Sequence, residues 1–393
     1  MDVLKRKLVF NEILNESRKI FQNQSITSIE NLSNEIFYEI FDYFDGGEMV
    51  KIFSKLNSRF EQLLQSSFVL IKTHFFLFYH EAIMNKDHEL EIFSNKLCSN
   101  LKILSIYCSQ NIIFLEAHRW EQLILHYYPQ LEKFYLTYHD GINNNNQYPI
   151  YTGPVNQFSS SFWIQRKWMF HVKIDNTYIK YSIYPYKKTW YNYIDDNKIE
   201  YSTSTSLIFT NFLTWSYDEM IFEQIKRVLT ITQIYHLIII EKHSSVHVLI
   251  QLISLLPDLI TFKIRSLSSD DRTRFTVREL CRLGSIKCQS KTTKVCIEEI
   301  NDIDDFNFIS VVCPYMKYCE MKRLNNMNIE LFLRIILKEI NNRSFCFIRL
   351  LCFHEPTVDD QMIENLEKMI NYEQLLLQFT IKRISDNIYL QWK

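Results

Sequence analysis

The chain has 393 residues, of which 47% are hydrophobic and 15% are aromatic. This composition excludes a largely disordered protein, because disorder requires low hydrophobicity together with high net charge. The 44 basic and 45 acidic residues give a formal net charge of −1, so charge gives no reason to expect nucleic acid or an anionic membrane as a partner.

We expect residues 1–25 to form a helical extension. A basic cluster at 5–7 is followed by a run that Asn11 and Glu12 interrupt, so no secretion signal is predicted. The richest apolar stretch, 68–79, is shorter than the roughly 20 residues that span a bilayer. The nine cysteines form no CxxC pair, which is typical of reduced, buried cysteines. The expected location is the cytoplasm or the nucleus.

Apolar residues between 32 and 64 recur at helical spacing in two blocks. In the first block Ile36, Ile40, Tyr43 and Phe44 fall at i, i+4, i+7 and i+8, which is one stripe of a helix. Ser33 or Asn34 can cap the start of this helix. Gly46 and Gly47 end it, and the block from 48 to 64 predicts a second helix or two short helices joined near Asn57.

The order and spacing of these residues resemble the F-box, a short helical module that docks onto the adaptor of a ubiquitin ligase. The family pattern has a leucine, a glutamate-isoleucine pair, an apolar stripe, a tyrosine and an acidic turn. In this sequence those positions are Leu32, Glu35, Ile36, Ile40, Tyr43, Phe44, Asp45 and Met49. Arg59 and Phe60 stand where the family often has arginine and tryptophan. Two features depart from the pattern: Ser33 replaces a proline, and Phe44 and Met49 replace leucines.

The resemblance implies a three-helix F-box at 26–75 that inserts apolar residues between helices of the adaptor. The residues expected to bind the adaptor are Leu32, Ser33, Glu35, Ile36, Ile40, Phe44, Met49, Leu56 and Phe60. Serine at 33 lacks the rigid helix start that proline provides, so weaker docking is one expectation. The alternative is an ordinary helical hairpin that caps a larger domain.

From residue 76 to 393, strand-like and helical runs alternate. The strands centre near Leu104, Phe134, Phe209, Ile239, Phe262, Cys296, Cys319 and Phe347. The helices are expected at 120–127, 217–229, 246–255, 277–283, 307–312, 329–340 and 359–370. Three junctions between a helix and a strand follow one pattern. In each, a proline ends the helix, a Leu or Met stands two residues later, and a short strand follows; the prolines are Pro129, Pro257 and Pro314.

This alternation predicts an α/β fold: the F-box followed by an irregular β-α solenoid that resembles leucine-rich repeats, whose period is about 20–29 residues. The repeats are degenerate, and an irregular α/β domain without true repeats is the alternative. Within it, 140–206 predicts an antiparallel β-hairpin insertion, with strands at 162–174 and 178–186 and a turn at Asp175-Asn176. Its many aromatic residues either form a recognition surface or, as we favour, cover the hairpin and its parent sheet.

Neither catalysis nor a metal site is expected. His243 and His247 form an HxxxH pair without the glutamate of a metalloprotease, and we interpret them as surface residues. Cys281, Cys288 and Cys296 are too far apart for a zinc ribbon or finger. Paired carboxylates at 270–271 and 304–305 are explained by helix capping. No glycine-rich phosphate loop and no GxSxG elbow occurs, so no cofactor is predicted.

The F-box resemblance implies a substrate-recognition subunit of an SCF-type, cullin-RING ubiquitin ligase that performs no catalysis itself. Its expected partners are the SCF adaptor, a cullin scaffold held through that adaptor, and a target protein bound by the solenoid, whereas no nucleic acid or membrane is expected. The alternative is a protein-interaction scaffold outside ubiquitination, in which the F-box-like hairpin only caps the solenoid.

Overall fold

The computed structural model describes residues 101–109, 112–141, 151–175, 177–187, 189–190, 205–210, 218–268, 275–325, 327–342, 347–356 and 359–392, with the backbone of 71–75 and single positions between 32 and 59. The chain divides into two compact units, residues 1–138 and 139–393. Strands alternate with helices in the described residues, and most neighbouring strands are parallel. The predicted α/β class is therefore confirmed.

In the first unit β1 (Ile71–Phe75) runs parallel to β2 (Ile103–Ser109), and β2 is followed by η3 (Ile112–Leu115), α6 (Ala117–Tyr127) and the start of β3 (Lys133–Gly141). Trp120 of α6 lies 5.4 Å from Phe134 of β3, centroid to centroid, and donates its indole N–H to the carbonyl of Phe114 at 2.8 Å. β1 falls inside the range 26–75 that the sequence assigns to the helical module, and it pairs with the sheet.

In the second unit, the elements after the end of β3 are, in chain order, η4 (Gln157–Ser159), α7 (Ser161–Arg166), β4 (Trp168–Ile174), β5 (Tyr178–Pro185), β6 (Ser206–Phe209), α8 (Asp218–Ile231), β7 (His236–Ile239), α9 (Val246–Ser254) and β8 (Thr261–Ile264). It continues with α10 (Val277–Gln289), β9 (Lys294–Ile297), α11 (Ile303–Val312), β10 (Tyr318–Met321), α12 (Ile329–Asn342), β11 (Leu350–His354), α13 (Asp360–Tyr372), β12 (Phe379–Ile384) and β13 (Asn387–Trp392). The strand order is β5-β4-β6-β7-β8-β9-β10-β11-β13-β12.

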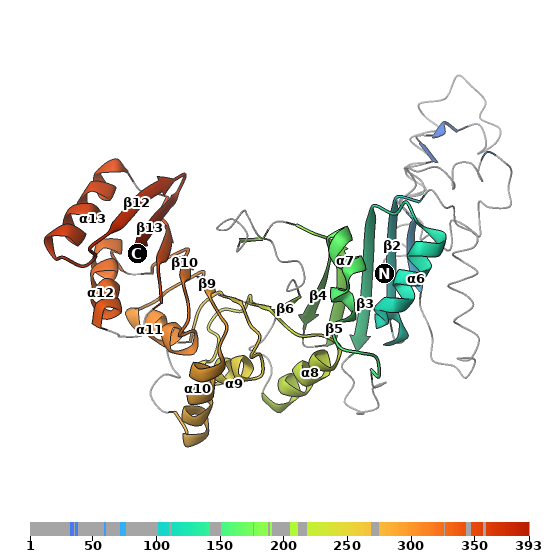
Figure 1. The fold of residues 1–393 in the computed structure, drawn as a ribbon, viewed down its shortest axis with the longest axis horizontal. Helices are drawn as coiled ribbons and strands as arrows, with labels where there is room; N and C mark the ends of the chain where they lie inside the picture. Colours follow the sequence, from blue (N-terminus) through green and yellow to red (C-terminus); the bar gives the residue numbers. More distant parts are fainter. Residues whose placement is uncertain are drawn as a thin grey trace, which may run out of the picture. The chain divides into compact units, whose positions relative to one another are not determined.

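From β6 to β11, each strand pairs in parallel with the next strand in sequence. Such crossovers are almost always right-handed, which places every connecting helix on the same face of the sheet. Figure 1 shows α9, α10 and α11 side by side on that face. The core beneath the helices includes a row of fully buried residues in register: Leu207, Leu237, Phe262, Val295, Cys319 and Leu351.

The three proline junctions fold alike, as predicted. In each, the buried Leu or Met donates its N–H to the carbonyl three residues earlier: Leu131 to Tyr128, Leu259 to Leu256 and Met316 to Cys313, at 3.0–3.2 Å. The next two N–H groups then bond to one carbonyl of the preceding strand segment. Because proline stops the helix and the buried side chain anchors the turn, each strand begins at the same point relative to its neighbour.

Three expectations differ from the structure. The stretch expected as a strand at 162–174 begins as helix α7, which ends where Lys167 has a left-handed φ of 55°; a short apolar run such as Phe162 to Ile164 is compatible with either element. The β4-β5 hairpin is antiparallel as predicted, but it is no insertion outside the sheet, because β4 pairs with β6. Phe347 precedes β11 and is 39% exposed.

Candidate functional site

Among the predicted adaptor-binding residues, Leu32, Ser33 and Ile36 belong to the described positions. Leu32 is buried, Ser33 is exposed and Ile36 is half-buried. The Ser33 carbonyl accepts the N–H of Phe37 at 3.2 Å, so the helix begins directly after Ser33. The other predicted residues, Glu35, Ile40, Phe44, Met49, Leu56 and Phe60, lie outside the described residues.

Arg59 links the second helical block to the start of the first. Its guanidinium donates to the Leu32 carbonyl at 2.5 Å and to Asn34 Oδ1 at 2.8 Å. The same group lies 5.5 Å from the ring centroid of Phe37, a residue that is fully buried. Arginine suits this position because its planar fork bonds two acceptors while it stacks on an aromatic ring. Sequence reasoning placed Arg59 in the motif but gave no role to Phe37.

The face of the second unit's sheet that carries no connecting helices begins with a buried polar row. His171 Nδ1 bonds to the Ser206 hydroxyl, and His236 Nδ1 lies 2.8 Å from Thr261 Oγ1. All four residues are buried. Burial, with a smaller contribution in the same direction from the nearby His236, lowers the pKa of His171 to about 3. The neutral His171 imidazole therefore ties β4 to β6, and the His236 contact ties β7 to β8.

An aromatic pair lies further along the same face. The ring of Trp190, which follows β5, stacks on Tyr318 of β10 with 6.4 Å between the centroids and 25° between the planes. The Tyr318 hydroxyl donates to Glu320 Oε2 at 3.2 Å. The segment after β5 therefore lies against the helix-free face at Trp190.

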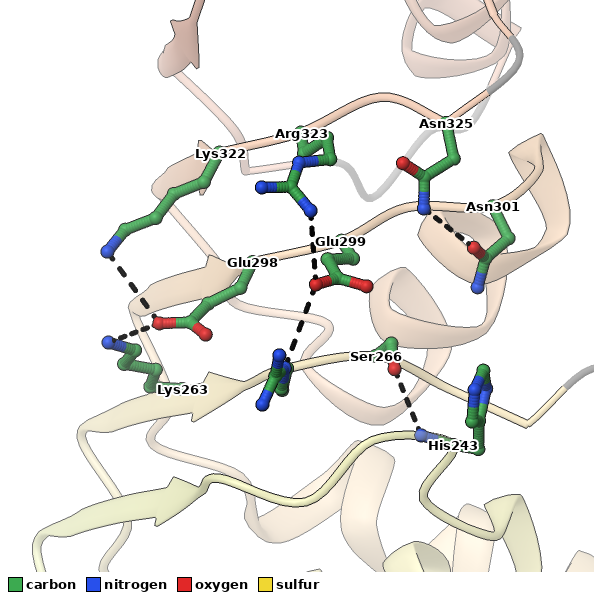
Figure 2. Close-up of polar contacts among 10 residues, drawn as sticks. His243, Lys263, Ser266, Glu298, Glu299, Asn301, Lys322, Arg323 and Asn325 are labelled. Carbon is green, nitrogen blue, oxygen red and sulfur yellow. Dashed lines mark hydrogen bonds and ion pairs between the residues drawn. The ribbon is translucent and has the colours of Figure 1, made fainter.

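At the carboxyl ends of β8, β9 and β10 the charged side chains form a ladder (Figure 2). Glu298 accepts from Lys263 at 2.7 Å and lies 3.7 Å from Lys322 Nζ. Glu299 lies 3.7 Å from Arg265 Nε and 3.4 Å from an amino nitrogen of Arg323. We call these six residues the charged ladder. Parallel strands place their carboxyl ends at one edge, which brings side chains from separate β-α units together.

The central pair of the ladder, Glu298 and Lys263, keeps its charges. Burial raises the pKa of the Glu298 carboxyl, but the hydrogen bond and charge of Lys263 and the charges of Lys322 and Arg265 lower it more, so the net pKa is below its usual range. Burial lowers the pKa of Lys263, whereas Glu298 and other neighbours raise it to a net value above normal. The outer cations are accessible, since the side chain of Arg323 is 68% exposed.

Polar contacts continue beyond the ladder. The Asn325 amide donates to Asn301 Oδ1 at 2.9 Å, and the N–H of His243, whose φ is 58°, donates to Ser266 Oγ at 2.9 Å (Figure 2). Together with the ladder, these groups make a polar edge that is suited to binding a protein surface through charge and hydrogen bonds. The spacing of repeated strands, rather than a motif, is the sequence signal that could have located this edge.

The structure also describes several of the residues that the sequence offered as metal ligands or helix caps. His247 Nδ1 contacts Glu279 Oε1 at 2.6 Å, so this histidine is engaged with the capping box that Thr276 and Glu279 form at the start of α10. Asp302 and Asp305 form another capping box at the start of α11; of the predicted pair at 304–305, Asp305 takes part in the cap and Asp304 lies in the first turn of the helix. Cys281 and Cys288 are exposed and Cys296 is buried. Among the described residues, no three His, Cys, Asp or Glu side chains gather as a metal site.

Within the described part of the chain, no helix is both long enough and apolar enough to cross a membrane. A scan against protein-family models gives no match, and a search of curated proteins likewise finds none.

Proposed function

We propose that this chain is a substrate-recognition subunit of an SCF-type ubiquitin ligase, acting in the cytoplasm or the nucleus. Its N-terminal F-box-like module would bind the adaptor and, through it, a cullin. The observation that carries the proposal is the position of Arg59, which bonds to Leu32 and Asn34 at the start of the first helix. These contacts support a folded module made of the same two blocks that carry the resemblance.

The C-terminal region would bind the target as an irregular, leucine-rich-repeat-like solenoid. This is supported by strands that follow one another in sequence order from β6 to β11 and by the repeated junction geometry. The charged ladder is the surface we assign to the target, because its outer residues Lys322 and Arg323 are 41% and 68% exposed.

In this role the chain contributes proximity rather than bond chemistry. Holding a target beside the ubiquitin-charged enzyme replaces a bimolecular encounter with one at high effective concentration. The charged ladder consists of paired lysine, arginine and glutamate side chains, which suit recognition of a protein surface.

The test is complex formation between the full-length chain and the purified adaptor, followed by size-exclusion chromatography. Replacement of Ile36 and Ile40 by Glu should abolish the complex, because two charges would enter an apolar helix interface. The matched control replaces Leu331 and Leu377 by Glu; these leucines are 51% and 96% exposed. The control should bind the adaptor like the wild type.

Two outcomes would overturn the proposal. One is a folded Ile36→Glu, Ile40→Glu variant that keeps the adaptor. The other is a folded wild-type chain that does not bind it, which would favour a scaffold outside ubiquitination whose helical hairpin caps the C-terminal region.

A further inference from the structure

A groove of about 630 Å³ lies among three helices of the second unit. Phe222 and Lys226 come from α8, Gln251 and Leu255 from α9 and the residue after it, and Arg282 from α10. This volume is within the range of roughly 300–1,000 Å³ that is typical of ligand sites. The groove lies on the helix-covered side of the sheet, whereas the charged ladder lies at the carboxyl ends of β8, β9 and β10.

The groove carries a net positive charge. Lys226 is paired with Glu223 at 2.7 Å, so these two lining charges offset each other. Arg278 and Arg282, one turn apart on α10, also line the groove. Among the described residues neither of these arginines forms an ion pair or hydrogen bond. Two uncompensated guanidinium groups therefore face the same groove.

Apolar surface accompanies these cations. Phe222 and Leu255 are half-buried in the groove wall. These two side chains give the groove an apolar wall beside Arg278 and Arg282. A site that combines apolar walls with a few charged groups is typical of ligand and peptide binding.

We propose that this groove binds an acidic peptide segment of a partner protein, one whose carboxylates alternate with hydrophobic residues. Arg278 and Arg282 would each take a carboxylate through paired N–H donors. Phe222 and Leu255 would contact the hydrophobic side chains, and the Gln251 amide can bond to the peptide backbone.

Charge complementarity selects this occupant over a second copy of the chain. Two copies that met through α10 would place Arg278 and Arg282 against a helix with the same cations, and like charges across an interface are unfavourable. A free inorganic anion would leave Phe222 and Leu255 exposed to water. The proposal goes beyond the proposed function, because it involves neither the adaptor nor the charged ladder.

Fluorescence anisotropy with the full-length chain tests the proposal. The probe is a labelled peptide in which pairs of glutamate alternate with single leucines, and its two comparison peptides replace every glutamate by glutamine or every leucine by glutamate. The first peptide should bind most tightly. Its affinity should also fall as salt is raised, because the exposed charge pairs are screened.

The decisive variant is Arg278→Gln with Arg282→Gln, for which we expect roughly tenfold weaker binding of the glutamate-leucine peptide. The matched control, Lys287→Gln with Lys317→Gln, removes two exposed positive charges away from the groove lining and should bind like the wild type. Urea denaturation of each variant serves as an independent check that it is folded.

The proposal would be overturned by any of three results: no binding of the glutamate-leucine peptide, equal binding of its glutamine counterpart, or equal losses in the two double variants. Equal binding of the all-glutamate peptide would also contradict it, because the apolar wall would then contribute nothing.

Discussion

Trp190 stacks on Tyr318, with 6.4 Å between the ring centroids, although one residue follows β5 and the other begins β10. This contact places the described end of the aromatic-rich segment on the helix-free face of the sheet. For Trp190, covering the sheet is therefore the better interpretation, and its ring is part of the fold rather than a free recognition surface.

Replacing Trp190 by Ala should lower the free energy of unfolding by about 1–3 kcal/mol, since it removes a stacked ring and exposes part of Tyr318. Urea denaturation measures the change. Tyr372→Ala is the control, because Tyr372 is 90% exposed and its loss should change stability little. If the two variants lose the same amount, the stacking contact has no role in stability.

The proline junctions could be predicted because their signals are local. Pro129, Pro257 and Pro314 stop helices through their own geometry, and the buried residue two positions later is apolar in each case. The predicted strand centres from Leu104 to Cys319 all fall within strands, but Phe347 precedes β11, and no strand centre was predicted for β1, β12 or β13. The structure of 162–166 could not be predicted, because its helix depends on packing of Phe162 and Trp163.

The degenerate repeat pattern also has a physical explanation. In a leucine-rich repeat, an asparagine stands three positions after the last leucine of the strand. Here Leu267, Ile300 and Leu324 occupy that place after Ile264, Ile297 and Met321. Leu267 and Ile300 are buried, so an apolar side chain fills the core where the pattern expects an amide. The charged ladder depends on alignment between distant strands, and no local motif predicts it.

Arg227 and Asp140 form a largely buried ion pair, with side chains 14% and 7% exposed. Burial raises the pKa of Asp140, and the charge and hydrogen bond of Arg227 oppose that rise. Arg227→Met should therefore raise the Asp140 pKa further and destabilise the protein by about 3–5 kcal/mol, as expected when one partner of a buried pair is removed. Denaturant unfolding measures this loss.

A double-mutant cycle completes that test. Adding Asp140→Leu to Arg227→Met should recover much of the lost stability, because the unpaired carboxylate is removed. Simple addition of the two single losses would contradict a coupled pair.

Stability should fall as the pH is lowered below neutrality. Burial and His236 lower the pKa of His171 from 6.5 to about 3, and burial with Lys180 and Lys173 lowers that of His139 to about 4. The unfolded chain therefore binds more protons than the folded chain between these values and pH 6.5. The folded state holds both imidazoles neutral. The stability that depends on their being neutral is fully present above pH 6.5, and it is lost progressively down to about pH 3 for His171 and pH 4 for His139.

His171→Asn should remove part of this dependence, because asparagine does not titrate and its amide can keep a bond to Ser206. Unfolding free energies at neutral pH and near pH 4.5 give the comparison. The difference between the two conditions should be smaller in the variant than in the wild type. An unchanged difference would mean that His171 does not titrate with the proposed shift.

Arg59→Lys should weaken the N-terminal module while keeping its charge. Lysine cannot bond Leu32 and Asn34 with one planar group or stack in the same way on Phe37. We expect faster proteolysis around residue 32 and weaker adaptor binding. Arg383→Lys is the control, since that arginine is part of an exposed pair on β12. Equal proteolysis of the two variants would contradict the role of the Arg59 contacts.

Glu298→Gln should destabilise the charged ladder because Lys263 and Lys322 would lose their shared counter-charge. Glu298 is 29% exposed, so solvent limits the expected loss to about 1 kcal/mol. The loss should shrink as salt is raised, because salt screens the attraction that the wild type gains. Glu132→Gln, which breaks one pair whose members are 46% and 59% exposed, should cost less. Urea unfolding at low and high salt distinguishes the two variants: if Glu298→Gln costs no more than Glu132→Gln, or if its cost is independent of salt, the ladder contributes no electrostatic stability and its residues remain available only for binding.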